Sequence, residues 1–185
     1  EAGWWAREIT GATTEQNRFI PFNHGEYCDP ALYTSAVALD RLYQAGDQRL
    51  LELYKRFESQ CEEAGADAVM VANAPPYHPD YLRKLSIYKV LYSADDPGAT
   101  YLINIPYLHA YDHVFFVAPA YSRDMDMTGK MKYAGMINAH WLPISVFDFE
   151  CEPDLHEDEL FGRRRDIDVI YIGGFWRQKL PVLAQ

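Results

Sequence analysis

The sequence lacks the features that mark several classes of protein. No apolar run approaches the roughly 20 residues that a membrane-spanning helix needs, and the first residues do not have the pattern of a signal peptide. Basic residues are few: 17 Lys and Arg stand against 27 Asp and Glu, which gives a formal net charge of −10. This charge argues against nucleic acid or an anionic membrane as the main partner, although a local basic group can still hold a small anion.

Cysteine is scarce as well. The three cysteines, Cys28, Cys61 and Cys151, are odd in number and share no metal-type spacing. Disulfide frameworks and zinc ribbons need paired cysteines at characteristic separations. Reduced thiols in a cytoplasmic protein are therefore the simplest interpretation. Internal repeats and low-complexity segments are also absent from the sequence, which excludes repeat architectures.

The chain does have ample apolar and aromatic material for a core. Hydrophobic residues make up 49% and aromatic residues 15% of its 185 residues, and tyrosine occurs 14 times. Tyrosine buries well while keeping a hydroxyl group, which suits core edges and contacts with sugars. The length allows one domain of ordinary size and a fragment of another. Because the chain opens on "EAGWWAREIT", like the middle of a helix, and closes on "RQKLPVLAQ", like the start of one, we expect both ends to be cut.

Strand-like and helix-like segments alternate along the chain. Apolar runs of strand length predict strands at 18–22 (RFIPF), 67–74 (DAVMVANA), 88–93 (YKVLYS), 113–118 (HVFFVA), 139–143 (AHWLP) and 168–174 (DVIYIGG). Helices are expected at 30–43, at 47–65, near Pro79, and from a cap at Ser122 to Gly135. The pattern predicts an α/β fold: a Rossmann-like parallel sheet flanked by helices, with strands buried on both faces.

The segment from Asp47 to Gly65 is the best-specified helix. Asp47 is a good N-cap, and Gly65 is a natural terminator. Glu52 and Arg56 form a favourable i,i+4 pair. Apolar residues that step by three and four predict one buried stripe made of Leu50, Leu53, Tyr54, Phe57 and Cys61.

In parallel sheets, ligands bind outside the carboxyl ends of the strands. Here those ends fall at 73–78, 93–98, 118–121, 143–146 and 173–177. These loops are where function is expected.

Over residues 66–185 the chain resembles the two-domain GT-B glycosyltransferases, and it is most similar to the spore-maturation (CgeB-like) family. The resemblance is carried by the order and spacing of YHPDYLRKL, SADDP, YDHVFFVAPAYSRDM, KYAGMINAHWLPISVFD and DVIYIGGFWRQKLPVL. It implies an acceptor-side domain at 1–150 whose first strand is missing, a linker at 151–166, and the beginning of a donor-binding domain at 167–185. The missing strand implies that a catalytic base can lie outside this sequence.

The resemblance implies that the intact protein transfers a sugar from a nucleotide-sugar donor to the hydroxyl of an unidentified acceptor. Enzymes of this type stabilise the departing diphosphate with backbone N–H groups and basic side chains, so no cofactor and no metal are expected. A non-catalytic α/β binding module is the alternative.

The Gly173-Gly174 pair follows an expected strand and precedes an expected helix. Glycines there let backbone N–H groups approach a phosphate, and the helix N-terminus adds positive potential. Arg177 and Lys179 are placed to neutralise a diphosphate, and the resemblance makes this the donor loop. The alternative is an ordinary tight turn between strand and helix.

Asp95 and Asp96 lie at a strand end, where one of them can orient an acceptor hydroxyl or act as a base. The alternative is turn chemistry, since Asp-Asp-Pro-Gly is typical of a turn that caps the next helix. An acidic pair also marks receiver domains, but there it follows the first strand of the domain. His24, in a glycine-containing loop, is a second catalytic or sugar-binding candidate, with an exposed loop histidine as the alternative.

Three further residues lie in the carboxyl-end loops and are candidates for acceptor binding: Tyr77, His78 and Tyr121. A metal site is not expected. His109 and His113 have i,i+4 spacing, but His113 begins a strand, so the two share no helix face. The Asp-x-Asp sequence at 124–126 falls in an expected helix, where its carboxylates point apart. Trp141 is expected in the core because it alternates into a buried strand.

Overall fold

The computed structural model describes residues 13–29, 32, 35–73, 76–95, 97–98, 100–118 and 125–143. The chain divides into two compact units, Glu1–Ser145 and Val146–Gln185, and all described residues belong to the first. The expected linker at 151–166 and the expected donor-domain start at 167–185 lie outside the described residues. Together with the expected domain boundary at residue 150, they stay predictions.

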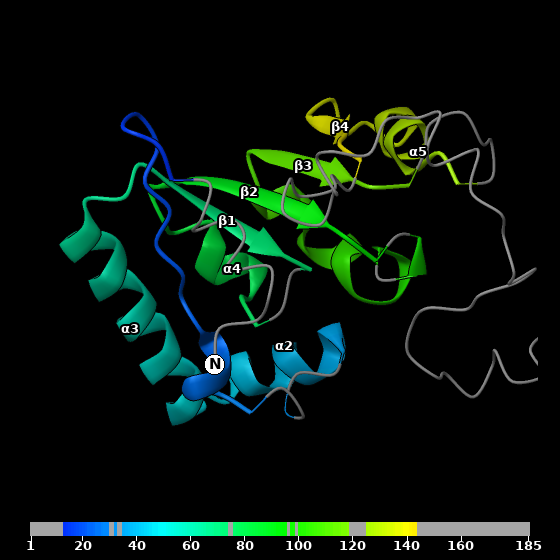
Figure 1. Ribbon diagram of the computed structural model, residues 1–185. Helices are drawn as coiled ribbons and strands as arrows, with labels where there is room; N and C mark the ends of the chain where they lie inside the picture. The colour runs from blue at the N-terminus through cyan, green and yellow to red at the C-terminus, as the bar shows by residue number, and fades with distance from the viewer. Residues whose placement is uncertain are drawn as a thin grey trace, which may run out of the picture. The chain divides into compact units, whose positions relative to one another are not determined.

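The described strands form one parallel sheet (Figure 1). They are β1 (Ala68–Ala72), β2 (Tyr88–Ser93), β3 (His113–Phe116) and β4 (Ala139–Trp141), which lie side by side in sequence order. Each neighbouring pair is parallel, and the register places Met70 opposite Val90 and Leu91 opposite Val114. The predicted α/β fold with a Rossmann-like parallel sheet is confirmed.

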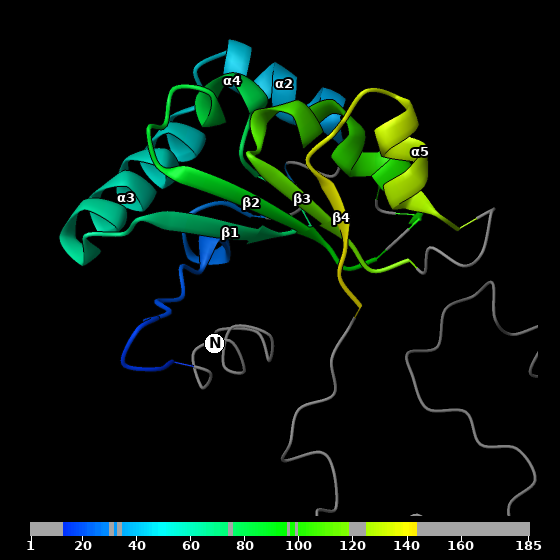
Figure 2. The same ribbon diagram turned by 90° about the horizontal axis from the view of Figure 1, so that it is seen from above.

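The helices that pack on the sheet lie on one of its faces (Figure 2). They are α2 (Ala36–Gln44), α3 (Gln48–Ala64), α4 (Pro79–Leu82), η3 (Thr100–Asn104), η4 (Ile105–Ala110) and α5 (Met127–Tyr133). Right-handed crossovers between strands that follow in sequence order all fall on the same face. None of the helices in the described part combines the length and the apolar character that a membrane span requires.

The core lies between these helices and the sheet. The buried side chains of α3 pack in one cluster with Val71, Leu91, Val114 and Phe116 from the strands. On the opposite face of β1, Ala68, Met70 and Ala72 are exposed. The expectation that this strand is buried on both faces is therefore wrong, because β1 is an edge strand of the described sheet and the described helices cover only one face.

Helix α3 forms as its sequence predicts. The Asp47 side chain accepts hydrogen bonds from the backbone N–H groups of Arg49 and Leu50, and Gly65 ends the helix in the left-handed conformation at φ 59°. The predicted stripe is buried except for Cys61, which is half-buried. The Arg56 Nε atom lies 2.8 Å from Glu52 Oε1.

Helix α4 begins at Pro79 as expected. Two other helices begin later than predicted. Helix α2 begins at Ala36 with Ser35 as its N-cap, whereas the prediction began this helix at Pro30. Helix α5 begins at Met127, with Asp126 as the N-cap through a hydrogen bond that its side chain accepts from Gly129 N. Asp126 is therefore a cap and not part of a helix face, and Ser122 and Asp124 lie outside the described residues.

Two expectations about apolar segments are wrong. Residues 18–22 are not a strand: Arg18 and Pro21 hydrogen-bond to Ala64 and Gln60 of α3 instead of to a neighbouring strand. Trp141 is 46% exposed, because it is the last residue of β4 at the edge of the described sheet. Its indole N–H donates to the Val117 carbonyl oxygen at 3.3 Å.

Candidate functional site

The predicted site residues fall into two groups. His24, Tyr77, His78 and Asp95 are described. The others lie outside the described residues: Asp96, Tyr121, Gly173, Gly174, Arg177 and Lys179. Their assigned roles stay predictions.

Asp95 is held at the carboxyl edge of the sheet by Asn73. Asn73 follows β1 and adopts the left-handed conformation at φ 56°, which asparagine tolerates better than most residues. Its backbone N–H donates to the Tyr92 carbonyl oxygen at 3.0 Å. Its side-chain oxygen accepts from Ala94 N at 2.8 Å, and its Nδ2 donates to Asp95 Oδ2 at 2.6 Å. The amide thus fixes the exposed Asp95 carboxylate at the end of β2.

A buried polar cluster lies behind Asp95. Ser93, Thr100 and Asn104 are each 0% exposed. The Ser93 and Thr100 hydroxyl oxygens are 3.0 Å apart, and Asn104 Nδ2 donates to Ser93 Oγ at 2.9 Å. These bonds tie η3, a single turn of π-helix, to the end of β2. Such turns occur frequently at functional sites.

We call Asn73, Ser93, Asp95, Thr100 and Asn104 the carboxyl-edge site. Sequence reasoning found only Asp95 among them. The signal for Asn73 is an asparagine directly after a buried strand, where a left-handed residue often redirects the chain. Within the described residues Asn104 Oδ1 is buried and has no hydrogen-bond partner, so one acceptor of the site is unused.

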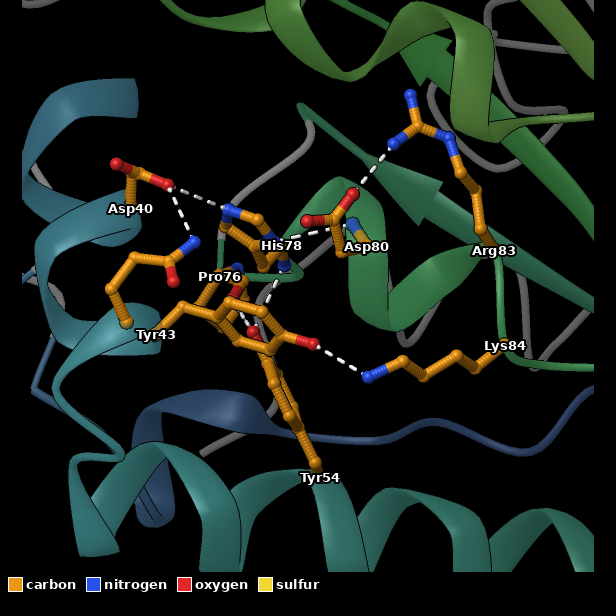
Figure 3. Close-up of polar contacts among 9 residues, drawn as sticks. Asp40, Tyr43, Tyr54, Pro76, His78, Asp80, Arg83 and Lys84 are labelled. Carbon is orange, nitrogen blue, oxygen red and sulfur yellow. Dashed lines mark hydrogen bonds and ion pairs between the residues drawn. The ribbon is translucent and has the colours of Figure 1, made fainter.

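His78 lies in a second polar cluster, shown in Figure 3. Its Nδ1 accepts a hydrogen bond from the Asp80 backbone N–H at 3.2 Å, which makes His78 the N-cap of α4. Its Nε2 lies 3.2 Å from Asp40 Oδ1 of α2. Because Nδ1 acts as an acceptor, the neutral ring carries its proton on Nε2 and donates it to Asp40.

Two tyrosines complete this cluster. The Tyr43 ring stacks on His78, with centroids 4.0 Å apart and planes inclined by 6°. The Tyr54 hydroxyl donates to the Pro76 carbonyl oxygen at 3.0 Å and accepts from the His78 backbone N–H at 2.9 Å. We call Asp40, Tyr43, Tyr54 and His78 the His78 network. It joins α2, α3 and the loop after β1 (Figure 3).

Tyr77, the other predicted acceptor contact in this loop, is 4% exposed. The centroid of its ring lies 5.0 Å from that of Phe57 and 6.2 Å from that of Tyr54.

Two buried tyrosines of this region have raised pKa values. Burial raises the pKa of Tyr54. Burial, with a smaller contribution from Asp40, raises the pKa of Tyr107 to about 12. Both phenols therefore stay protonated at neutral pH and do not act as bases.

His24 lies in η1 (His24–Glu26), on the N-terminal segment that packs on α3 through the edge-to-face contact of Phe22 with Phe57. The ring is half-buried, and burial lowers its pKa below the usual value for histidine. Burial therefore favours the neutral form of His24. Asp95, in contrast, follows β2, so the two described residues of the three predicted catalytic ones come from separate segments of the domain.

Two shallow surface hollows lie elsewhere. One is lined by Arg18, Gln60 and Glu63, and the other by Cys61, Gly65 and Ile87 among others. Both border the C-terminal half of α3, and the second lies beside the residues that precede β1 and β2. Neither includes Asp95, so they do not define the site. In the described part of the chain, no group of three or more His, Cys, Asp or Glu side chains is arranged to hold a metal ion.

In comparisons with known proteins, no protein-family model, curated protein or solved structure matches the chain.

Proposed function

We propose that the described domain is the acceptor side of a two-domain glycosyltransferase, in which Asp95 binds the acceptor hydroxyl. The observation that carries this proposal is the 2.6 Å hydrogen bond from Asn73 to the exposed Asp95 carboxylate. This bond holds the Asp95 carboxylate at the carboxyl edge of the parallel sheet, where ligands of such folds bind. The sequence resemblance to GT-B glycosyltransferases supplies the reaction class.

Asp95 has the chemistry that the acceptor half of this reaction needs. A carboxylate can accept a hydrogen bond from a sugar hydroxyl and orient its oxygen toward the donor, or take its proton as a base. In the transfer itself, the acceptor oxygen forms a bond to the anomeric carbon of the donor. The bond from that carbon to the diphosphate oxygen breaks, and the nucleoside diphosphate leaves with the electron pair. The hydroxyl proton passes to the base or to water.

Stabilisation of the diphosphate is assigned by this proposal to the donor loop. Gly173 and Gly174 supply backbone N–H groups, and Arg177 and Lys179 supply positive charge. These roles come from the sequence alone. In this proposal the described domain orients the acceptor, and the donor loop binds the diphosphate.

The test is a transferase assay on the full-length gene product. A panel of nucleotide sugars is supplied with saccharide acceptors, with and without a chelator, and release of nucleoside diphosphate is measured. We expect release with at least one donor, unchanged by the chelator. In Asp95→Asn the rate should fall about 10²–10⁴-fold, the range for loss of a positioned acid–base group.

Asp67→Asn is the matched control. Asp67 is also exposed, but it precedes β1 and so lies at the opposite end of the strands. Its rate should stay within about twofold of wild type. Equal losses in both variants, or no donor binding or hydrolysis across the panel, would contradict the proposal. Binding of a saccharide without any turnover would favour the non-catalytic binding module.

A further inference from the structure

Two histidines lie side by side on the face of the sheet that is turned away from the core. In β3 and β4, Val114, Phe116 and Ala139 belong to the core cluster. Because side chains alternate along a strand, His113 and His140 point to the other face. His113 Nδ1 lies 2.7 Å from His140 Nε2, and the ring centroids are 4.8 Å apart.

The parallel register brings these rings together. Phe115 is directly opposite His140, and His113 is two residues before Phe115 on the same face. His113 and His140 are thus diagonal neighbours, a separation that long or aromatic side chains bridge. The Phe115 ring lies 5.3 Å from His140 and 6.4 Å from His113. The backbone ladder therefore presets the position of both imidazoles.

The hydrogen bond between the two rings implies that at least one is neutral, since one nitrogen gives a proton and the other receives it. A neutral imidazole is the form that ligates metal ions. The hydrogen-bonded pair therefore already holds at least one ring in the form that a metal ion requires.

We propose that His113 Nδ1 and His140 Nε2 together bind one divalent transition-metal ion. Imidazole suits Zn²⁺, Ni²⁺ and Cu²⁺. The ring that now donates shifts its proton to its other nitrogen, so the complex forms without loss of a proton or an electron. With metal–nitrogen bonds of 2.0–2.1 Å at a tetrahedral angle, the two nitrogens stand about 3.3 Å apart, so metal binding requires the rings to separate from their present 2.7 Å. Water fills the remaining positions, because the described residues hold no group of three ligating side chains.

The test uses this chain without an affinity tag, after treatment with a chelator, and titrates Ni²⁺ by calorimetry. We expect one ion per chain. His113→Asn and His140→Asn should each weaken binding at least about tenfold, since even loss of an outer partner of a ligand costs 10–100-fold. His109→Asn is the control, because His109 is an exposed histidine in η4 and should bind no part of the ion.

A second measurement needs no variant. Paramagnetic Cu²⁺ added to the isotope-labelled wild-type chain should broaden the backbone signals of residues 113–115 and 139–141 first. Circular dichroism establishes that each variant is folded. The proposal is overturned by the absence of saturable Ni²⁺ binding, by equal affinity in both folded variants and wild type, or by broadening centred on other residues.

Discussion

The carboxyl-edge site and the His78 network both lie in loops that follow the strands, but they differ in how many of their polar groups are already used. His78 is buried, with one ring nitrogen capping α4 and the other bonded to Asp40. Asp95 is exposed, and within the described residues it is held by one hydrogen bond from the Asn73 amide. One cluster therefore fastens helices to a loop, whereas the other presents a charged group to solvent.

This difference shows that residue type alone does not identify a functional group. A histidine and a tyrosine at a strand end are attractive candidates for ligand binding. In this fold the Tyr54 hydroxyl and the His78 ring satisfy backbone groups that burial would otherwise leave without partners. If the His78 network is structural and the carboxyl-edge site binds ligand, substitutions in the network should alter stability. Substitutions in the carboxyl-edge site should alter ligand binding.

The largest stability effect is expected for Tyr54→Phe. The substitution keeps the ring but removes the hydroxyl that bridges the Pro76 carbonyl oxygen and the His78 N–H. Two buried backbone groups lose their partner, so the free energy of unfolding should fall by about 2–4 kcal/mol. Urea unfolding measures this value. The control is Tyr133→Phe, which should change it by less than about 0.5 kcal/mol because Tyr133 is 96% exposed. A similar small change in both variants would contradict the structural role of Tyr54.

A smaller effect separates the two roles of His78. His78→Ala removes the cap and the ring, whereas His78→Asn keeps a side chain that can cap α4. We expect His78→Asn to be more stable than His78→Ala by about 1 kcal/mol, measured by urea unfolding. Both folded variants should bind ligand as wild type does. Loss of ligand binding in a stable His78→Asn variant would contradict the purely structural role of His78, since it would show that His78 contacts the ligand.

The smallest expected effect concerns pH. Burial lowers the pKa of His24, and burial followed by His113 and Lys132 lowers that of His140. The folded state then binds fewer protons than the unfolded state, so stability is complete above about pH 6.5 and declines as the pH falls below it. A hydrogen bond from Arg49 lowers the pKa of Asp47 to about 2, which adds its own loss only below about pH 4.

Unfolding curves at pH 7.5, 6.5 and 5.5 isolate the histidine contribution. The free energy of unfolding should decrease toward pH 5.5, and His140→Asn should reduce that decrease. A rise in stability over the same interval would show that the histidines gain protons on folding, contrary to the contacts described for them.

The sequence predicts the parts of this fold whose causes are local. Helix α3 is specified by Asp47, Gly65 and the apolar stripe between them, all of which lie in one stretch of 19 residues. The strands β1 to β4 are predicted because each is an apolar run bounded by turn residues. The strand predicted at 18–22 is wrong because apolar composition does not show whether another strand is available for pairing. Here the segment lies beside α3 instead.

The carboxyl-edge site depends on contacts that are distant in sequence. Asn73 and Asp95 are 22 residues apart, and they meet only because β1 and β2 are in parallel register. The π-helix turn η3 is fixed by the bonds among Ser93, Thr100 and Asn104, for which the sequence offers no periodic signal. Asp95 and Asn73 each carry a local signal, their place directly after a strand, but the sequence does not show that the two side chains bond to each other.

The most direct test of the distinction between the two clusters is to map saccharide binding on the wild-type chain by nuclear magnetic resonance. A panel of monosaccharides and disaccharides is titrated into the isotope-labelled protein, and backbone shifts are followed. We predict saturable changes centred on Asn73, Ala94 and Asp95, with little change at Asp67 at the opposite end of β1. Changes confined to other surfaces, or no saturable change with any member of the panel, would contradict the assignment of the carboxyl edge as the ligand site.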